Sequence, residues 1–156
     1  MQSSGYFPHL DVLLQAMRIS RDRLNGRSKV AIDAKLLRRI LQCVAIHLPF
    51  SEEFYRGTYP DIAQAVAAGR IPDLHRHFVE TGFFEGRLGA PPPVDEGFYR
   101  GLYKDVAAAI ARGDVNSGAE HYVRSGAAEG RVPSADLKPE IDGWMSVLRV
   151  ATLSET

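Results

Sequence analysis

Four polar residue types recur at matching places in the middle of the chain. They are Asp61, His77, Glu85 and Arg87, and again Asp105, His121, Glu129 and Arg131. A histidine, a carboxylate and an arginine held together could form a small polar site for a sugar or a carboxylate. Alternatively, the histidine donates to a backbone carbonyl, while the arginine pairs with Asp or Glu and fastens the turn after Gly82 or Gly126. Polar residues that recur within a repeat favour this structural role, and the residues alone leave both alternatives open.

Two further features could carry chemistry, a histidine pair and the single cysteine. His75 and His77 are two residues apart, so on a helix they point to different faces and chelate a metal poorly. Cys43 lies in an apolar segment with only His47 nearby, which predicts a buried, unreactive thiol. The sequence has no phosphate-binding loop, dinucleotide fingerprint, nucleophile elbow or calcium loop. We therefore expect no enzyme activity, no cofactor and no metal site.

Aromatic residues offer a third kind of surface. The recurring tyrosines could stack on sugar rings, but at helix boundaries they are expected to fill gaps between short helices; they are Tyr55, Tyr59, Tyr99 and Tyr103. Phe83 and Phe84 differ from these, because the second copy has alanine at both places. Two adjacent phenylalanines do not easily both point inward, so they are candidates for an interface.

The elements that must position these residues belong to an internal repeat. Shifting the chain by 44 residues aligns Ser51–Arg87 with Asp95–Arg131 without a gap, and 17 of the 37 positions are identical. Repeats of 20–50 residues are typical of stacked supersecondary units. The two tandem repeats are assigned to residues 49–87 and 94–131.

Each repeat is expected to consist of short helices separated by glycines. The expected helices cover residues 52–56, 60–68, 72–81, 105–112 and 117–125. Pro60 suits a first helical position, and Gly69 and Gly113 suit left-handed ends. The second helix of each repeat stops at Gly82 or Gly126. Alanine-rich helices this short are unstable alone, so they must pack on one another and on the aromatic residues.

The flanking segments also have helical periodicity. A helix is predicted over residues 8–24, followed by one that Ser28 could cap, and together they form an N-terminal hairpin over residues 1–48. The apolar side of the second helix comprises Leu37, Ile40, Leu41, Val44 and Leu48. An amphipathic helix that contains Trp144 follows in residues 132–156, and Pro91–Pro93 predict an extended spacer. No segment alternates with period two, so the prediction is an all-α fold, one compact domain overall.

Charge is divided unevenly along the 156 residues. Nineteen basic and nineteen acidic residues balance, which excludes a uniformly basic binder of nucleic acid. Residues 1–48 carry +5, since three aspartates oppose eight basic residues: Arg18, Arg21, Arg23, Arg27, Lys29, Lys35, Arg38 and Arg39. The basic segment could pack on the acidic remainder, stay solvated, or bind an acidic protein or membrane surface. A lone cysteine, with no secretion signal and no apolar run long enough for a membrane span, favours the cytoplasm.

The repeat carries a recognisable pattern, FYxxxYxDVAxAxxxGxxxxxxxHYxxxGxxEGR. It resembles the short aromatic–PDVA–HY–G–EGR repeat of bacterial surface-polysaccharide proteins, found beside glycosyltransferases and in rhamnan-synthesis-type proteins. The resemblance covers residues 52–87 and 96–131 and implies an accessory module rather than a catalytic domain. Lys104 replaces the proline in the second copy, and Phe78 replaces the tyrosine in the first.

The leading hypothesis is a non-catalytic adaptor or regulatory subunit in bacterial polysaccharide synthesis or envelope assembly. Its partner would be a larger enzyme or envelope protein, or a second copy of the chain. Candidate interaction residues are Arg18, Arg21, Arg38, Arg39, Phe83, Phe84 and Trp144. One alternative is a carbohydrate-binding module that uses the recurring polar sets, with an acidic glycan as its ligand. The other is a nucleic-acid-binding regulator that uses the basic segment, for which the balanced charge gives little support.

Overall fold

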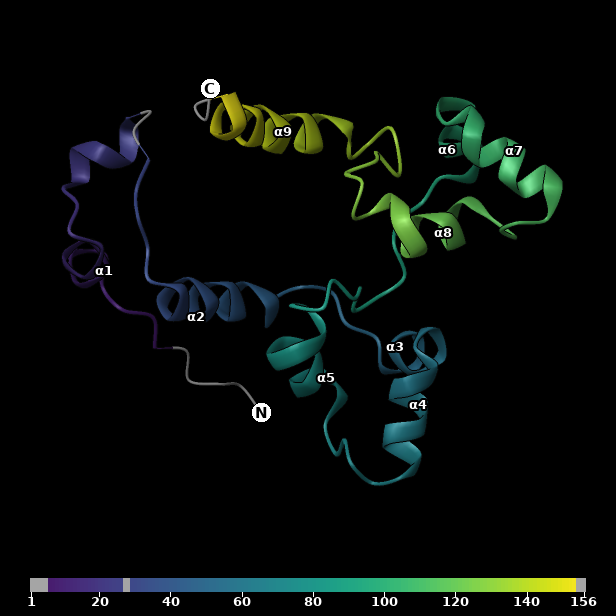
Figure 1. Cartoon of the computed structure of the whole chain (residues 1–156), viewed down its shortest axis with the longest axis horizontal. Helices are drawn as coiled ribbons and strands as arrows, with labels where there is room; N and C mark the ends of the chain where they lie inside the picture. The colour runs from purple at the N-terminus through teal and green to yellow at the C-terminus, as the bar shows by residue number, and fades with distance from the viewer. Residues whose placement is uncertain (1–5, 27–28, 154–156) are drawn as a thin grey trace. The chain divides into compact units, whose positions relative to one another are not determined.

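The computed structural model describes residues 6–26 and 29–153 (Figure 1). All regular secondary structure in these two ranges is helical, which confirms the predicted all-α class. The chain divides into two units, Met1–Cys43 and Val44–Thr156. This division lies five residues before the predicted one at residue 48. Since residues 44–48 contain no Lys, Arg, Asp or Glu, the first unit keeps the whole charge of +5.

The first unit differs from the predicted long helix over residues 8–24. Helix α1 (Leu10–Met17) ends at Arg18, whose backbone is left-handed (φ 55°), and a short 3₁₀ helix, η1 (Arg21–Asn25), follows. The N–H groups of Arg18 and Ile19 donate to carbonyls of the last helical turn, which closes the helix end. Glycine usually occupies such a position, so an arginine there gives no stop signal in the sequence.

Helix α2 (Ala34–Ala45) begins later than a cap at Ser28 would allow. The carboxylate of Asp33 accepts hydrogen bonds from the N–H groups of Lys35 and Leu36, at 2.8 and 3.2 Å, and so caps this helix. Ser28 itself lies outside the described residues. Cys43 is half-buried, so its predicted full burial is wrong.

The two repeats contain the same succession of elements (Figure 1). In the first, α3 (Glu52–Thr58), α4 (Pro60–Ala67) and α5 (Leu74–His77) lead into a π-helical turn, η2 (Phe78–Gly82). In the second, α6 (Glu96–Leu102), α7 (Lys104–Arg112) and α8 (Gly118–His121) lead into η3 (Tyr122–Gly126), also π-helical. Pro60 opens α4, and Gly69 and Gly113 are left-handed, as predicted. The predicted last helix of each repeat is thus an α-helix that continues without a break as a π-helix to Gly82 or Gly126.

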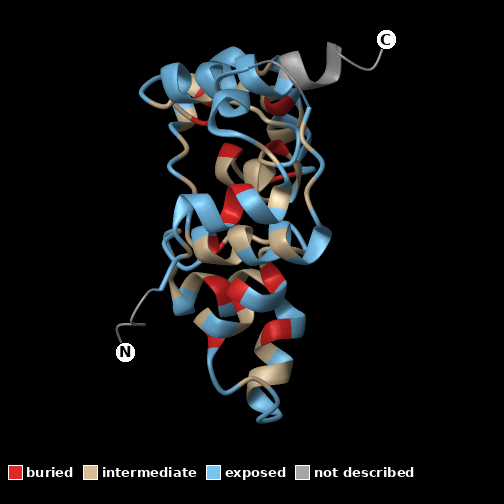
Figure 2. Cartoon of the chain, turned by 90° about the vertical axis from the view of Figure 1, so that its left-hand side faces the viewer, coloured by how far each residue is buried: buried red, intermediate tan, exposed pale blue. Residues whose placement is uncertain are grey.

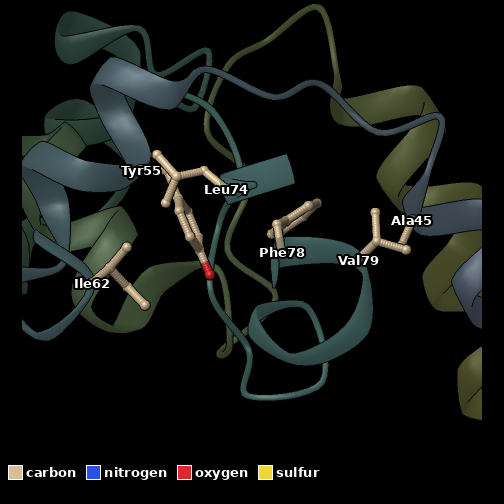
Figure 3. Close-up of a cluster of buried hydrophobic side chains, with 6 residues drawn as sticks. All are labelled: Ala45, Tyr55, Ile62, Leu74, Phe78 and Val79. Atoms are coloured by element: carbon tan, nitrogen blue, oxygen red, sulfur yellow. The ribbon is translucent and has the colours of Figure 1, made fainter. Parts of the chain in front are cut away.

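A tyrosine lies at the centre of each repeat. In the first repeat, Tyr55 has no exposed surface and packs in a buried cluster (Figure 3) whose other members are Ala45, Ile62, Leu74, Phe78 and Val79. Figure 2 shows the buried residues of the chain in red. Its counterpart Tyr99 is equally buried. Burial of a whole aromatic ring supplies much of the apolar contact that helices of four to nine residues need.

Gly82 and Gly126 make room for these two rings. A Cβ atom on Gly82 would lie 2.0 Å from the hydroxyl oxygen of Tyr55, and one on Gly126 would lie 2.3 Å from that of Tyr99. Neither glycine has a positive φ. The helical run does end at both glycines as predicted, but their structural role is the close approach of the tyrosine.

Each repeat is closed by a backbone hydrogen bond between its two ends. The N–H of Ser51 donates to the carbonyl of Gly89 at 2.8 Å, and 44 residues later the N–H of Asp95 donates to that of Pro133 at 3.0 Å. Pro91–Pro93 between them form no helix, in agreement with the predicted spacer.

The C-terminal helix α9 (Lys138–Leu153) forms as predicted. Met145 packs against the second repeat, since a Cβ on Gly130 would lie 2.5 Å from its terminal methyl carbon. Trp144, Val147 and Leu148 are exposed. On this helix, Met145 therefore faces the second repeat, whereas Trp144, Val147 and Leu148 face solvent.

The space in front of Gly82 provides a test of the core. We expect Gly82→Ala to lower the free energy of unfolding by about 1–3 kcal/mol, because the added methyl group overlaps the Tyr55 hydroxyl. Gly57→Ala is the matched control, since its Cβ meets nothing within 4 Å in α3, and it should stabilise by about 0.5–1 kcal/mol. Urea unfolding measures both.

Combining Gly82→Ala with Tyr55→Phe should recover part of the loss, since the overlapping oxygen is removed. Equal effects of the alanine at positions 57 and 82 would contradict this account of the core.

Candidate functional site

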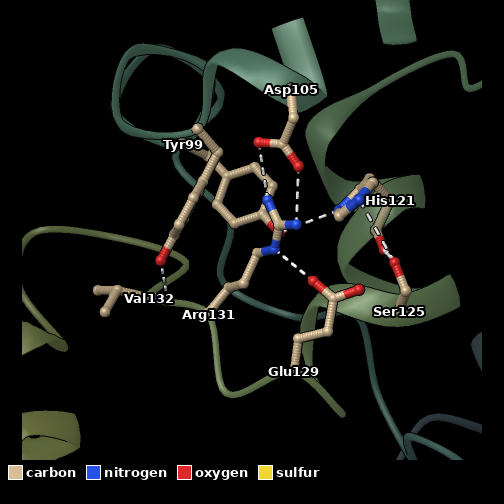
Figure 4. Close-up of polar contacts among 8 residues, drawn as sticks. Tyr99, Asp105, His121, Ser125, Glu129, Arg131 and Val132 are labelled. Atoms are coloured by element: carbon tan, nitrogen blue, oxygen red, sulfur yellow. Dashed lines mark hydrogen bonds and ion pairs between the residues drawn. The ribbon is translucent and has the colours of Figure 1, made fainter.

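An arginine joins the last turn of each repeat to the start of its second helix. In the second repeat, the guanidinium of Arg131 donates two parallel hydrogen bonds to the carboxylate of Asp105, at 3.0 and 2.7 Å (Figure 4). Its Nε donates to Glu129, two residues before it. The fork of Arg131 thus holds two carboxylates from separate parts of the repeat.

The first repeat has the same arrangement. Arg87 donates to the two carboxylate oxygens of Asp61 at 2.9 and 2.7 Å, and its Nε donates to Glu85 at 2.8 Å. The side chains of Arg87 and Arg131 are 19% and 18% exposed, whereas those of Asp61 and Asp105 are largely in solvent. The arginines are therefore the inner members of both ion pairs.

A second tyrosine completes this arrangement, and its role there does not follow from the sequence. The guanidinium carbon of Arg87 lies 4.8 Å from the ring centroid of Tyr59, and the hydroxyl of Tyr59 accepts a hydrogen bond from the N–H of Leu88 at 2.8 Å. Arg131, Tyr103 and Val132 repeat this geometry with the same distances. The sequence signal for this role is that both tyrosines recur at the 44-residue spacing.

The histidines form a separate pair with the buried tyrosines. The hydroxyl of Tyr55 is 3.1 Å from Nδ1 of His77, and that of Tyr99 is 3.1 Å from Nδ1 of His121. Ser125 lies 3.3 Å from the other ring nitrogen of His121 (Figure 4). The hydrogen bond expected from histidine to a backbone carbonyl is thus wrong. The ring satisfies the tyrosine hydroxyl, which burial would otherwise leave without a partner.

Burial and ion pairing shift the pKa values in opposite directions. Burial raises the pKa of Tyr55 and of Tyr99 to about 12, because the charged phenolate is poorly solvated there. The hydrogen bonds from Arg87 and Arg131 lower the pKa of Asp61 and of Asp105. The carboxylates also raise the pKa of both arginines, so the ion pairs stay charged at neutral pH.

This geometry determines what the polar sets can do. Each of the eight predicted residues has a partner within its own repeat, and Tyr55 and Tyr99 have no exposed ring on which a sugar could stack. The ion pairs instead fasten the turns that follow Gly82 and Gly126. What remains accessible is the outer side of the carboxylates, those of the two aspartates and of Glu85 and Glu129.

The predicted interaction residues are dispersed. Arg18 ends α1, and Arg21 is paired with Asp11. Arg38 and Arg39 are exposed on α2. Trp144 is 66% exposed on α9. Of these candidates, the exposed basic side chains lie in the first unit, and the exposed tryptophan lies on the C-terminal helix of the second unit.

Phe83 and Phe84 are both half-buried. Phe83 packs on the core of the first repeat, 6.2 Å from the ring centroid of Phe78. Phe84 contacts Phe83 edge-on at 5.3 Å. Neither ring is fully exposed, so these residues extend the core of the first repeat toward its surface.

An open groove within the second unit is a further concave feature. Its volume is about 700 Å³, and its lining comes from both repeats and their spacer: Phe54, Thr58, Tyr59, Pro91, Pro92, Ala119, Glu120, Val123 and Arg124. Its two charged residues, Glu120 and Arg124, are paired with each other at 3.2 Å. Within residues 6–26 and 29–153, no group of three or more His, Cys, Asp or Glu side chains could hold a metal ion.

Comparison of the chain with models of protein families, with curated proteins and with solved structures gives no match.

The ion pair can be tested through its geometry. We expect Arg87→Lys to lower the free energy of unfolding by about 1 kcal/mol, because lysine cannot donate the parallel pair of hydrogen bonds or stack on Tyr59. Arg124→Lys is the control, since its exposed pair with Glu120 in one helical turn should contribute below about 0.5 kcal/mol. Urea unfolding measures both variants. Similar losses of unfolding free energy would show that the forked geometry of the guanidinium adds no stability.

Alkaline titration provides a test of the buried tyrosines. The folded state keeps the protons of Tyr55 and Tyr99 up to about pH 12, whereas the unfolded chain releases them near pH 10. Stability from these groups is therefore complete below about pH 10 and is lost as the pH rises toward 12. Tyr55→Phe should reduce the fall in unfolding free energy over this range, with Tyr6→Phe, which removes an exposed hydroxyl, as the matched control. A slope unchanged by Tyr55→Phe would contradict the assignment.

Proposed function

We propose that the chain is a non-catalytic interaction protein, an adaptor or regulatory subunit of bacterial surface-polysaccharide synthesis or envelope assembly. In this role it binds a larger enzyme or envelope-assembly protein in the cytoplasm. The observation that carries the proposal is the exposed apolar side of α9.

Three large apolar residues lie on that side. Trp144, Val147 and Leu148 are 66%, 64% and 52% exposed, and their i, i+3, i+4 spacing places them on one face of the helix. Met145, at the edge of the same stripe, already packs at Gly130. An exposed tryptophan beside two aliphatic residues is the kind of group that forms the centre of a protein interface.

The recurring polar residues of the two repeats also support a non-catalytic role. Asp61, His77, Glu85 and Arg87 are engaged with one another or with tyrosines inside the first repeat, and their counterparts are engaged in the same way. These groups account for the recurring polar residues without a substrate. The polysaccharide context comes from the resemblance of the repeat to modules that accompany glycosyltransferases.

Site-specific photocross-linking in the native cell tests the proposal. A benzophenone amino acid at Val147 should cross-link the chain to one larger polypeptide. The same group at Ser146, about 150° around α9 from the centre of the face of Trp144, Val147 and Leu148, should not. With that partner purified, Trp144→Ala should weaken binding about 30-fold in calorimetry, as truncation of a central interface residue does.

Equal cross-linking from positions 146 and 147 would contradict the proposal. So would cross-linking to a second copy alone, which would make α9 an element of self-assembly.

A further inference from the structure

We infer that α2 is a binding element for the surface of an anionic lipid bilayer. The inference concerns the basic first unit and is independent of the partner proposed for α9. Lys35, Arg38 and Arg39 are the only charged side chains of α2, and all three are positive.

The positive charges gather on one side of the helix. At 100° per residue, Lys35, Arg38, Arg39 and Gln42 fall within an arc of about 100°. All three basic side chains are exposed to solvent. The carboxylate of Asp33, which directly precedes α2, is directed to the N–H groups that it caps.

The other side of α2 is apolar and partly open. Leu36, Ile40 and Leu41 are half-buried, whereas Leu37 and Val44 are 41% and 50% exposed. A strongly basic face opposite an apolar face is typical of helices that lie in the plane of a membrane surface. In that position the apolar face enters the boundary of the acyl chains, and the basic residues remain among anionic headgroups.

The rest of the first unit favours lipid over an acidic protein. Its net charge is +5, and the segment at and before α1 exposes further large apolar residues, namely Tyr6, Phe7, Leu10 and Val12. A protein groove accepts one narrow stripe, whereas a bilayer accepts apolar residues from several segments and aromatic rings at headgroup level.

The helix lies on the membrane rather than across it. Twelve residues span about 18 Å, well below the roughly 30 Å of a hydrocarbon core. None of the helices described in residues 6–26 and 29–153 is long and apolar enough to cross a membrane.

Vesicle binding tests the inference on the full chain. The chain should cosediment with vesicles of phosphatidylcholine and phosphatidylglycerol (60:40) at low salt, and much less with phosphatidylcholine alone. Since each basic residue near the surface contributes about fivefold, the triple variant K35Q/R38Q/R39Q should lower the partition coefficient about 100-fold. R38K/R39K keeps the charge and should bind within about threefold of the wild type.

Two further variants separate lipid insertion from simple charge attraction. R56Q/R70Q/R100Q removes the same charge from exposed positions in the repeats and should bind nearly as the wild type does. L37S/V44S should lower binding about tenfold or more with the charge unchanged, because two exposed apolar side chains no longer enter the bilayer. Circular dichroism confirms that each variant is folded.

Three results would overturn the inference. They are absence of binding to the anionic vesicles, equal losses in the two triple glutamine variants, and unchanged binding of L37S/V44S. Unchanged binding of L37S/V44S would mean that the chain is attracted to the vesicles by charge alone. An acidic protein or a nucleic acid could then take the place of the lipid.

Discussion

The constraint on which each repeat depends is the burial of one tyrosine ring among helices that are too short to be stable alone. Tyr55 and Tyr99 have no exposed surface, and their hydroxyls occupy the space where Gly82 and Gly126 lack a side chain. The ring brings apolar contact, but it also carries a hydroxyl out of water, which demands a partner. The histidine 22 residues later forms a hydrogen bond with that hydroxyl. Packing of the tyrosine ring and hydrogen bonding of its hydroxyl therefore constrain the core together.

The second tyrosine and the arginine solve a related problem at the end of each repeat. The chain must return from its π-helical turn to its starting point, where a single backbone hydrogen bond closes the repeat. Arg87 fixes this return from three directions, through Asp61, through Glu85 and through the face of Tyr59. Because guanidinium is planar and forked, it can satisfy two carboxylates and stack on a ring at once, which lysine cannot do.

The sequence predicts much of this fold, and the failures have definite physical causes. Local signals, such as Pro60 at a first helical position and Gly113 at a left-handed end, have the expected structure because they restrict the backbone directly. Arg18 adopts the conformation of a glycine, so nothing in its type predicts the end of α1. The partner of His77 lies 22 residues away, and only packing brings the two together. Recurrence shows that these polar residues matter, but it does not distinguish a ligand from a neighbour.

The differences between the repeats are consequently more informative about function than their similarities. The residues shared by both copies are those that build the repeat, whereas the surface changes: the i, i+4 pair Arg76–Glu80 has its charges reversed in Glu120–Arg124. The second copy also replaces the buried Leu74 with Gly118, which leaves room for the carboxylate of Glu96 to cap α8. Two repeats that share a core but differ in their surface charges do not have to bind the same ligand. The specific contacts of the chain are then expected from the parts that are not repeated, α2 and α9. These helices expose several large apolar side chains, whereas the repeats, within the described residues, expose one, Leu102.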